Sequence, residues 1–299
     1  MIIKTKKCTF AFRNSSNLRM SEEELFQIDL EKVIKSKSPK LGKRLPGFAF
    51  RLLEKIVCQD ELNRTLRTLY GLDGIDFMAG MVDDYDIRLV THGIENLDKE
   101  GRYLLASNHP LGGMDGICLT TVFGRYFNDK LKCLVNDVLL YVPVLRPPFV
   151  AVNKYGSQSR DAVKKMNETF ESDNQIITFP AGLVSRKING VVQDLEWKKT
   201  FITKARETKR DIVPVFFKGY NSNFFYNFSN IRKKLGIKFN IDLIFLPGEM
   251  MKSKHKTFEL YVGKPIDWNT FTDEKTDAEW ALWVREMAYA LPNEKSNLK

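Results

Sequence analysis

The sequence has little cysteine and histidine and no long apolar run. Its four cysteines are far apart and form no CxxC pair: Cys8, Cys58, Cys118 and Cys133. This pattern excludes a disulfide framework and the usual zinc motifs, and we expect buried cysteines in a reducing compartment. No segment reaches the ~18 consecutive apolar residues of a transmembrane helix, since the most apolar one, residues 138–152, contains Arg146 and three prolines. We therefore expect a protein that does not cross a membrane but can lie on one.

Basic residues outnumber acidic ones by 47 to 37, which gives a formal net charge of +10. Half of this excess lies in residues 1–19, and residues 20–299 retain 42 basic and 37 acidic residues, or +5. The first segment is either a transit peptide or a basic leader that is not native. We favour the second, because an ordinary protein start follows at Met20. The apolar share of 43% is sufficient for a large core and excludes a disordered chain.

Two regions follow this leader. Apolar residues recur at helical spacing through residues 20–87, which predicts a helical N-terminal region. From residue 88 to 299, strand-like and helix-like segments alternate. The strand-like runs are residues 88–91, 103–106, 131–135, 149–152, 175–179, 212–217, 242–246 and 258–262. This alternation predicts an α/β sheet covered by helices, with functional residues in loops past the strand ends.

Glycine, aspartate and proline give local signals within these regions. Gly71, Gly74 and Gly80 interrupt the helical pattern of the first region. Asp194 is placed to cap the helix that follows it. Pro214 lies inside a strand-like run and predicts an edge strand or a bulge, because proline has no amide hydrogen to donate.

The residues with the clearest chemistry follow one of the predicted strands. The run YLLASNHPLGGMDG places His109 directly after a strand, then two glycines, then Asp115. Glycine permits a tight turn, so the carboxylate can return to the imidazole, bind one ring nitrogen and leave the other as a base. A structural histidine in a glycine-rich turn is the alternative. The other two histidines, His92 and His255, lie in a turn and a basic loop, and we expect no chemistry from them.

A second run, IITFPAGLVSRKING, follows another predicted strand. Pro180 and Gly182 force an irregular turn in it. Backbone N–H groups of this turn, with Ser185, Arg186 and Lys187, can bind a phosphate or a carboxylate. A basic loop after a strand is more often simply solvated, so both interpretations stay open.

In this order, the motifs resemble those of the glycerolipid (lysophospholipid) acyltransferase superfamily. Its first motif is a His, four residues and an Asp; its third reads F-P-E-G-T-R-S-R; its fourth contains a V-P-V-like strand. The corresponding residues here are His109 with Asp115, FPAGLVSR at 179–186 and IVPVFF at 212–217, and PPFVAVNK at 147–154 stands in place of the second motif. The resemblance covers about residues 88–265.

The sequence looks most similar to the subgroup labelled hemolysins, which includes O-acyltransferases that make ornithine or glycine lipids. That subgroup has an NHPxGG loop, an FPAG motif and a downstream D-x-x-W, here Asp194 and Trp197. Its members also carry a helical N-terminal region with a D-E-L-N-like stretch, as at residues 60–63. Nothing in these residues indicates a lytic activity.

Two departures from the superfamily pattern bear on the site. Five residues rather than four separate the histidine from the aspartate, and Gly112 and Gly113 can absorb the extra residue in a loop. Ala181 and Val184 stand where the superfamily usually has Glu and often Arg. Because a cation is missing there, an amino-acid lysolipid fits at least as well as lysophosphatidic acid as the acceptor.

The resemblance implies a mixed, mostly parallel sheet and an acyltransferase domain in residues 88–299. It implies transfer of a fatty acyl group from a thioester, on acyl carrier protein or coenzyme A, to a lysolipid hydroxyl, without a metal or another cofactor. His109 is then the base and Asp115 orients it. The expected substrate-binding residues are Asn108, Gly112, Gly113, Lys154, Phe179, Pro180, Gly182, Ser185 and Arg186. The acceptor is an ornithine or glycine lysolipid or, alternatively, lysophosphatidic acid in phospholipid synthesis.

The clustering of basic residues fits an enzyme bound peripherally to the inner, cytoplasmic face of a membrane. Basic residues follow aromatic ones in residues 224–238, and a second basic stretch covers residues 251–256. Cations beside an anionic leaflet contribute about 1 kcal/mol each. A partly buried helix with a solvated end explains the first cluster equally well, and an acidic acyl carrier protein could use the same charge.

Three other classes of protein stay open. A thioesterase or lipase could use the same histidine and aspartate with water as acceptor, although there is no G-x-S-x-G elbow. A non-catalytic lipid-binding relative would account for the departures from the first and third motifs. A nucleic-acid-binding protein would account for the basic composition, but no recognised motif is present, so we expect no nucleic-acid partner.

Overall fold

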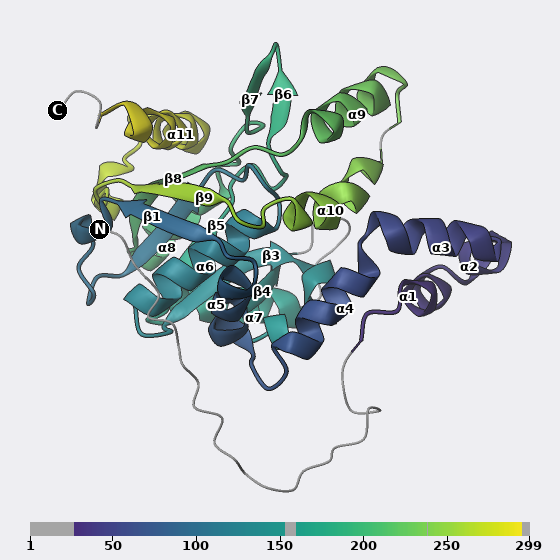
Figure 1. Ribbon diagram of the computed structural model, residues 1–299. Coiled ribbons are helices and arrows are strands. Elements are labelled where there is room, and N and C mark those ends of the chain that lie inside the picture. Colours follow the sequence, from purple (N-terminus) through teal and green to yellow (C-terminus); the bar gives the residue numbers. More distant parts are fainter. Residues whose placement is uncertain (1–26, 153–159, 238, 295–299) are drawn as a thin grey trace, which may run out of the picture.

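A seven-stranded sheet forms the centre of the protein. The computed structural model describes residues 27–152, 160–237 and 239–294, so the predicted leader, residues 1–19, lies outside the described residues. The strand order is β1-β9-β8-β2-β5-β3-β4, and neighbouring strands are parallel except β8 and β9 (Figure 1). The strands are β1 (Arg88–His92), β2 (Tyr103–Ser107), β3 (Leu131–Asn136), β4 (Phe149–Val152), β5 (Gln175–Thr178), β8 (Asp211–Lys218) and β9 (Thr257–Val262). The predicted mixed, mostly parallel sheet is confirmed.

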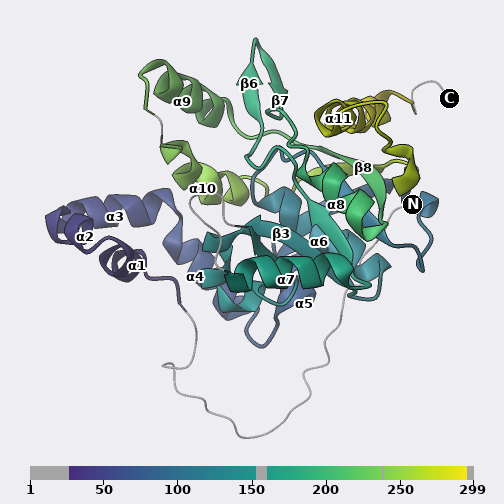
Figure 2. The same ribbon diagram turned by 180° about the vertical axis from the view of Figure 1, so that it is seen from behind.

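Helices cover both faces of this sheet. In β2, Leu105 belongs to the core under one face, whereas Leu104 and Ala106 belong to the core under the other, as the two-residue period of a strand requires. The first face carries α5 (Gly74–Asp84) and α6 (Met114–Tyr126). The second carries α7 (Arg160–Glu171), α8 (Thr200–Thr208) and α11 (Asp277–Glu294), which Figure 2 shows from behind. All five residues of β2 are therefore buried.

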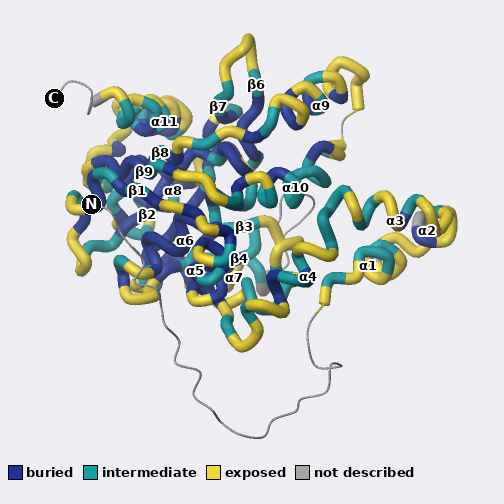
Figure 3. Tube along the Cα trace, viewed as in Figure 1, coloured by how far each residue is buried: buried dark blue, intermediate teal, exposed yellow. Residues whose placement is uncertain are grey.

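The predicted N-terminal helices are present, and most of them extend away from the sheet (Figures 1 and 2). They are α1 (Leu30–Lys37), α2 (Pro39–Arg44), α3 (Gly47–Ile56) and α4 (Gln59–Thr68). Figure 3 shows that α1, α2 and α3 are largely exposed. Asn63 of the D-E-L-N stretch has a structural role, because its side-chain amide exchanges two hydrogen bonds with the backbone of Ile28. The following helix, α5, packs on α6 in the main core.

Three smaller elements surround the carboxyl end of the sheet. β6 (Arg186–Ile188) and β7 (Val191–Gln193) form an antiparallel hairpin that projects from the body in Figure 1. α9 (Asn223–Lys234) and α10 (Leu246–Met251) lie beside it. Within the described ranges, none of the helices combines the length and the apolar character that crossing a bilayer requires.

One predicted strand and one predicted interruption are wrong. Residues 242–246 form no strand; most of them lie in a 3₁₀ helix, Ile241–Phe245, that leads into α10. Pro247 suits the first turn of α10, where an amide hydrogen has no partner within the helix. Gly71 and Gly74 do separate α4 from α5, but Gly80 lies inside α5. A Cβ atom at Gly80 would lie 2.9 Å from Leu69 Cδ2, so this glycine permits close packing.

Of the two alternatives predicted for Pro214, an edge strand or a bulge, the edge strand is wrong. β8 is an interior strand, between β9 and β2, and Pro214 pairs with Ala106 of β2. On the opposite side, the antiparallel ladder with β9 starts only at Val215, and an isolated bridge joins Ile212 to Ile266. Pro214 therefore stands at the gap between these two pairings, where β8 needs no amide hydrogen.

The two-faced core predicts how the fold responds to truncation of one of its side chains. Leu105→Ala removes a side chain that is completely buried in the central strand, so we expect a loss of about 2–5 kcal/mol in the free energy of unfolding. Leu282→Ala on α11 is the matched control, because Leu282 is 50% exposed and should cost less than about 0.5 kcal/mol. Urea denaturation measures both, and equal losses would contradict this assignment of the core.

Candidate active site

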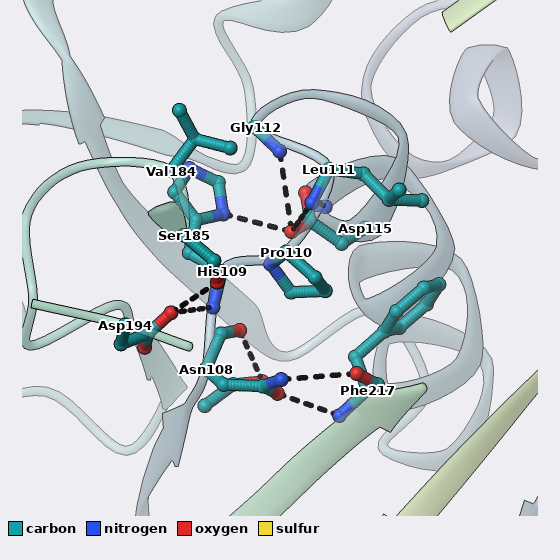
Figure 4. A network of polar contacts seen from close by, with 12 residues as sticks. Asn108, His109, Pro110, Leu111, Gly112, Asp115, Val184, Ser185, Asp194 and Phe217 are labelled. Atoms are coloured by element: carbon teal, nitrogen blue, oxygen red, sulfur yellow. Dashed lines mark hydrogen bonds and ion pairs between the residues drawn. The ribbon is translucent and has the colours of Figure 1, made fainter. Parts of the chain in front are cut away.

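The candidate site begins where β2 ends. The side chain of Asn108 continues the pairing of β2 with β8: its amide donates to the carbonyl oxygen of Phe217 at 3.0 Å, and Phe217 N donates to Asn108 Oδ1 at 2.7 Å (Figure 4). Because this side chain occupies the place of a further strand residue, the main chain leaves the sheet at the next position. That position is His109, at the carboxyl end of the strands.

A short loop then returns the chain to the start of α6. Gly112 has a φ of +77°, in the left-handed region that favours glycine. A Cβ atom there would lie 2.9 Å from Leu246 Cδ1 and 3.1 Å from Val184 Cβ. The loop is held from another element by Asn221, whose Nδ2 donates to the carbonyl oxygen of Pro110 at 3.2 Å. Gly113 is the residue before α6, and a Cβ atom at this position would have no neighbouring atom within 4 Å.

The imidazole of His109 lies against the carboxylate of Asp115, as the sequence predicts (Figure 4). His109 Nδ1 and Asp115 Oδ2 are 3.0 Å apart; the histidine side chain is 17% exposed and the aspartate is fully buried. Leu111 N and Gly116 N also donate to this carboxylate, at 3.0 and 2.8 Å. Since the amides hold the ionised carboxylate, Nδ1 is the donor to it, and Nε2 is the ring nitrogen directed away from Asp115.

The surroundings of Asp115 decide its charge. Burial alone would raise the pKa of this carboxyl, but the charge and hydrogen bond of His109, with the amides of Leu111 and Gly116, together lower it below its usual value. Asp115 also lies in the first turn of α6, where the positive end of the helix dipole favours an anion. The aspartate is therefore ionised and can stabilise a protonated His109.

The loop after β5 covers one face of the imidazole. The Phe179 ring stacks on the His109 ring with their centroids 4.1 Å apart and an angle of 29° between the planes. The turn that follows is closed by a hydrogen bond from Gly182 N to the carbonyl oxygen of Phe179, with Gly182 at a φ of +64°. Lys198 N donates to the carbonyl oxygen of Pro180 and fixes the turn from outside. The structure thus brings the predicted Phe179 against His109, and the predicted Pro180 and Gly182 lie in the turn that follows it.

Asp194 does not cap a helix, contrary to the sequence prediction, because α8 begins only at Thr200. Its carboxylate instead accepts hydrogen bonds from the backbone N–H of His109 at 3.2 Å, from the Ser185 hydroxyl, and from Trp197 Nε1 at 2.9 Å. Figure 4 shows Asp194 on the opposite side of the His109 backbone from Asp115. The D-x-x-W pattern is visible in the sequence, but its contact with the histidine is not.

Arg186 is directed into the protein. Its Nη2 lies 2.7 Å from Asp242 Oδ2, and Arg232 Nε lies 2.7 Å from the other oxygen of the same carboxylate. The guanidinium also lies over the Phe225 ring, 5.4 Å from its centroid. Burial lowers the pKa of Arg186 although Asp242 opposes this. Binding of a substrate anion by Arg186 stays a prediction. Asp242 and Asn221 are residues of this region that the sequence analysis did not identify.

Lys154 lies outside the described residues. His92 pairs with Glu259 at 3.2 Å, and His255 pairs with Asp86 at 3.0 Å, both away from the loop of His109. Among the residues that the structure describes, no group of three or more His, Cys, Asp or Glu side chains is suited to hold a metal ion.

Comparison with known proteins agrees with the resemblance seen in the motifs. A family described as "Acyltransferase" matches residues 32–297. A lyso-glycine lipid O-acyltransferase of Bacteroides thetaiotaomicron is 49% identical over 272 residues, which covers 91% of this chain and 100% of the relative. Another, of Phocaeicola vulgatus, is 48% identical over 273 residues, covering 91% and 98%. A crystal structure of the 1-acyl-sn-glycerophosphate acyltransferase PlsC from Thermotoga maritima is 18% identical, with a TM-score of 0.42, covering 83% of this chain and 93% of that one.

The two glycines of the loop should respond differently to alanine. Gly112→Ala places a Cβ atom in a left-handed backbone and against Leu246, so we expect a loss of at least about 1–2 kcal/mol of stability. Gly113→Ala meets no atom within 4 Å and should cost at most about 1 kcal/mol, as an ordinary residue before a helix. Denaturant unfolding of both variants measures the difference, and a larger loss at Gly113 would contradict the loop geometry.

Proposed function

This chain belongs to the acyltransferase family, and we propose that it transfers a fatty acyl group from a thioester to the hydroxyl of a lyso-glycine lipid. The observation that carries the proposal is the His109–Asp115 pair at the end of β2. It is present in a chain that is 49% and 48% identical to two lyso-glycine lipid O-acyltransferases. The thioester donor is acyl carrier protein or coenzyme A.

The geometry at His109 supports a general-base mechanism. Nε2 of the imidazole takes the proton of the acceptor hydroxyl while the hydroxyl oxygen attacks the thioester carbonyl carbon. Asp115 stabilises the resulting imidazolium through Nδ1. The tetrahedral intermediate then collapses: the carbon–sulfur bond breaks, the thiolate leaves and receives the proton from Nε2, and the ester remains on the acceptor. In this mechanism a backbone N–H of the loop at Gly113 stabilises the developing oxyanion.

The loop after β5 supports an acceptor with a small anionic group. Ala181 and Val184 are both buried and apolar, and Val184 packs against the position of Gly112. No cation can therefore approach the histidine loop from these two positions. A glycine headgroup carries a single carboxylate, so it needs fewer cationic groups around it than a phosphate monoester does.

The role of His109 predicts a selective loss of activity. His109→Ala removes the base, and we expect transfer to fall by about 10²–10⁴-fold, while the fold persists because the amides of Leu111 and Gly116 still donate to the Asp115 carboxylate. His92→Ala is the matched control, since His92 lies on β1 and pairs with Glu259. Initial rates with a fixed acyl donor measure both variants. Full activity in His109→Ala, or an equal loss in His92→Ala, would contradict this role.

The identity of the acceptor can be tested with the purified full chain. Lyso-glycine lipid and lysophosphatidic acid are offered separately, each with acyl carrier protein and with coenzyme A thioesters, and the ester products are quantified. We expect kcat/KM for lyso-glycine lipid to exceed that for lysophosphatidic acid by at least about tenfold. Preference for lysophosphatidic acid, or hydrolysis of the thioester without transfer, would contradict the proposed acceptor.

The surface beside the site supports a peripheral position on the inner face of a membrane. The α9 segment starts next to Asn221, which holds the histidine loop, and it presents Phe224, Ile231 and Leu235 to solvent. Phe239 follows and is 81% exposed. Exposed aromatic and aliphatic side chains with the neighbouring Lys233 and Lys234 suit the boundary of an anionic leaflet. An acceptor lipid could then reach His109 from the bilayer.

This surface predicts the behaviour of one double variant. Leu235→Gln with Phe239→Gln should reduce co-sedimentation with vesicles containing anionic phospholipid by roughly tenfold or more, because two apolar side chains each lose favourable burial. Leu282→Gln on α11 is the control, since it changes one exposed leucine on another element. Undiminished sedimentation of the double variant would contradict the assignment of this surface.

A further inference from the structure

The backbone of His109 is held at both of its polar groups. Its N–H donates to Asp194 Oδ1 at 3.2 Å, and its carbonyl oxygen accepts from Ser185 N at 2.8 Å. The Ser185 hydroxyl donates to the same Asp194 oxygen, which closes a ring of three residues. The loop after β5 and the segment after β7 thus both hydrogen-bond to the His109 backbone, independently of the contact between its ring and Asp115.

Asp194 is itself fixed by α11. Its backbone N–H donates to the hydroxyl of Tyr289 at 2.8 Å, and its carbonyl oxygen accepts from Arg285 Nη2 at 3.3 Å. The second carboxylate oxygen accepts from Trp197 Nε1, and the whole residue is 2% exposed. A buried carboxylate is costly unless it is fully hydrogen-bonded, and the three donors here satisfy both oxygens. Hydrogen bonds to both its backbone and its side chain therefore hold Asp194 in place.

The carboxylate of Asp194 also acts on His109 through its charge. Burial raises the pKa of Asp194, whereas its donors and the positive charge of a protonated His109 oppose this rise. By reciprocity, an ionised Asp194 favours the protonated imidazole, in addition to Asp115 on α6. The other titratable groups that face Asp194 are Arg285 and Tyr289 of α11.

We infer that Asp194 is a positioning residue for acyl transfer, which fixes the main chain of His109 while Asp115 fixes its ring. The inference rests on the proposed function, because it assumes that His109 is the base. A ring held by Asp115 alone could still move with its loop. If the His109 backbone is fixed as well, the distance from Nε2 to the acceptor hydroxyl varies less. The rate of proton transfer depends on how closely this distance is controlled.

The chemistry of an amide at position 194 provides a sharp test. In Asp194→Asn, one of the two side-chain atoms becomes an NH₂ group and must face a donor, either Trp197 Nε1 or the pair of His109 N and Ser185 Oγ. We expect kcat to fall about 10- to 100-fold, with KM for the lysolipid within about threefold. In a Trp197→Phe background the NH₂ group faces no donor, so the same substitution should lower kcat less than about threefold.

A merely structural role would give different results. In both backgrounds, activity would then fall only in proportion to the folded fraction, and this outcome would overturn the inference. Thermal unfolding of each variant measures the folded fraction. If the wild-type chain itself transfers no acyl group to lyso-glycine lipid, the proposed function fails and these rates do not apply.

A measurement that needs no substrate separates these cases. The chain has three histidines, so the ring signals of His109 can be assigned by NMR with His92→Gln and His255→Gln. We expect Asp194→Asn to move the titration midpoint of His109 to lower pH, because a negative charge that favours imidazolium is lost. An unchanged midpoint together with an unchanged His109 backbone amide signal would refute the inference, whether or not the acceptor is correct.

Discussion

The hydrogen bond between His109 Nδ1 and Asp115 is the interaction on which the rest of the site depends. It requires a fully buried carboxylate, which is stable only because the amides of Leu111 and Gly116 and the start of α6 also hold its charge. Those amides reach the carboxylate because the chain turns sharply at Gly112. The conformation of the loop, the start of α6 and the ionised state of Asp115 therefore depend on one another.

The order of the strands brings the other groups to this pair. β2 lies between β8 and β5 and is parallel to both, so the loops that follow these three strands meet at one edge of the sheet. The loop after β5 supplies Phe179 and Ser185, and the loop after β8 supplies Asn221. Residues distant in sequence thus meet at the His109 ring and at the loop that carries it.

Several polar side chains in this region have their partners inside the protein. Asn108 extends a strand, Asp194 holds a peptide, and Arg186 neutralises Asp242 inside the protein together with Arg232. Such residues carry charge or hydrogen-bonding groups and therefore look like ligand-binding residues in a sequence. Their burial explains these contacts, because a buried polar group must find its partners within the protein.

The sequence by itself determined the alternation of strands and helices, the pairing of His109 with Asp115 and the family resemblance, because these depend on short-range periodicity and on motifs of a few residues. It assigned Asp194 to a helix cap and residues 242–246 to a strand, and it left Pro214 between a sheet edge and a bulge; the structure corrected the first two and excluded the edge. Only the tertiary structure decided the partners of Asp194 and Arg186. Their hydrogen bonds and ion pairs join segments whose proximity follows from strand order, and strand order is not written in any local pattern.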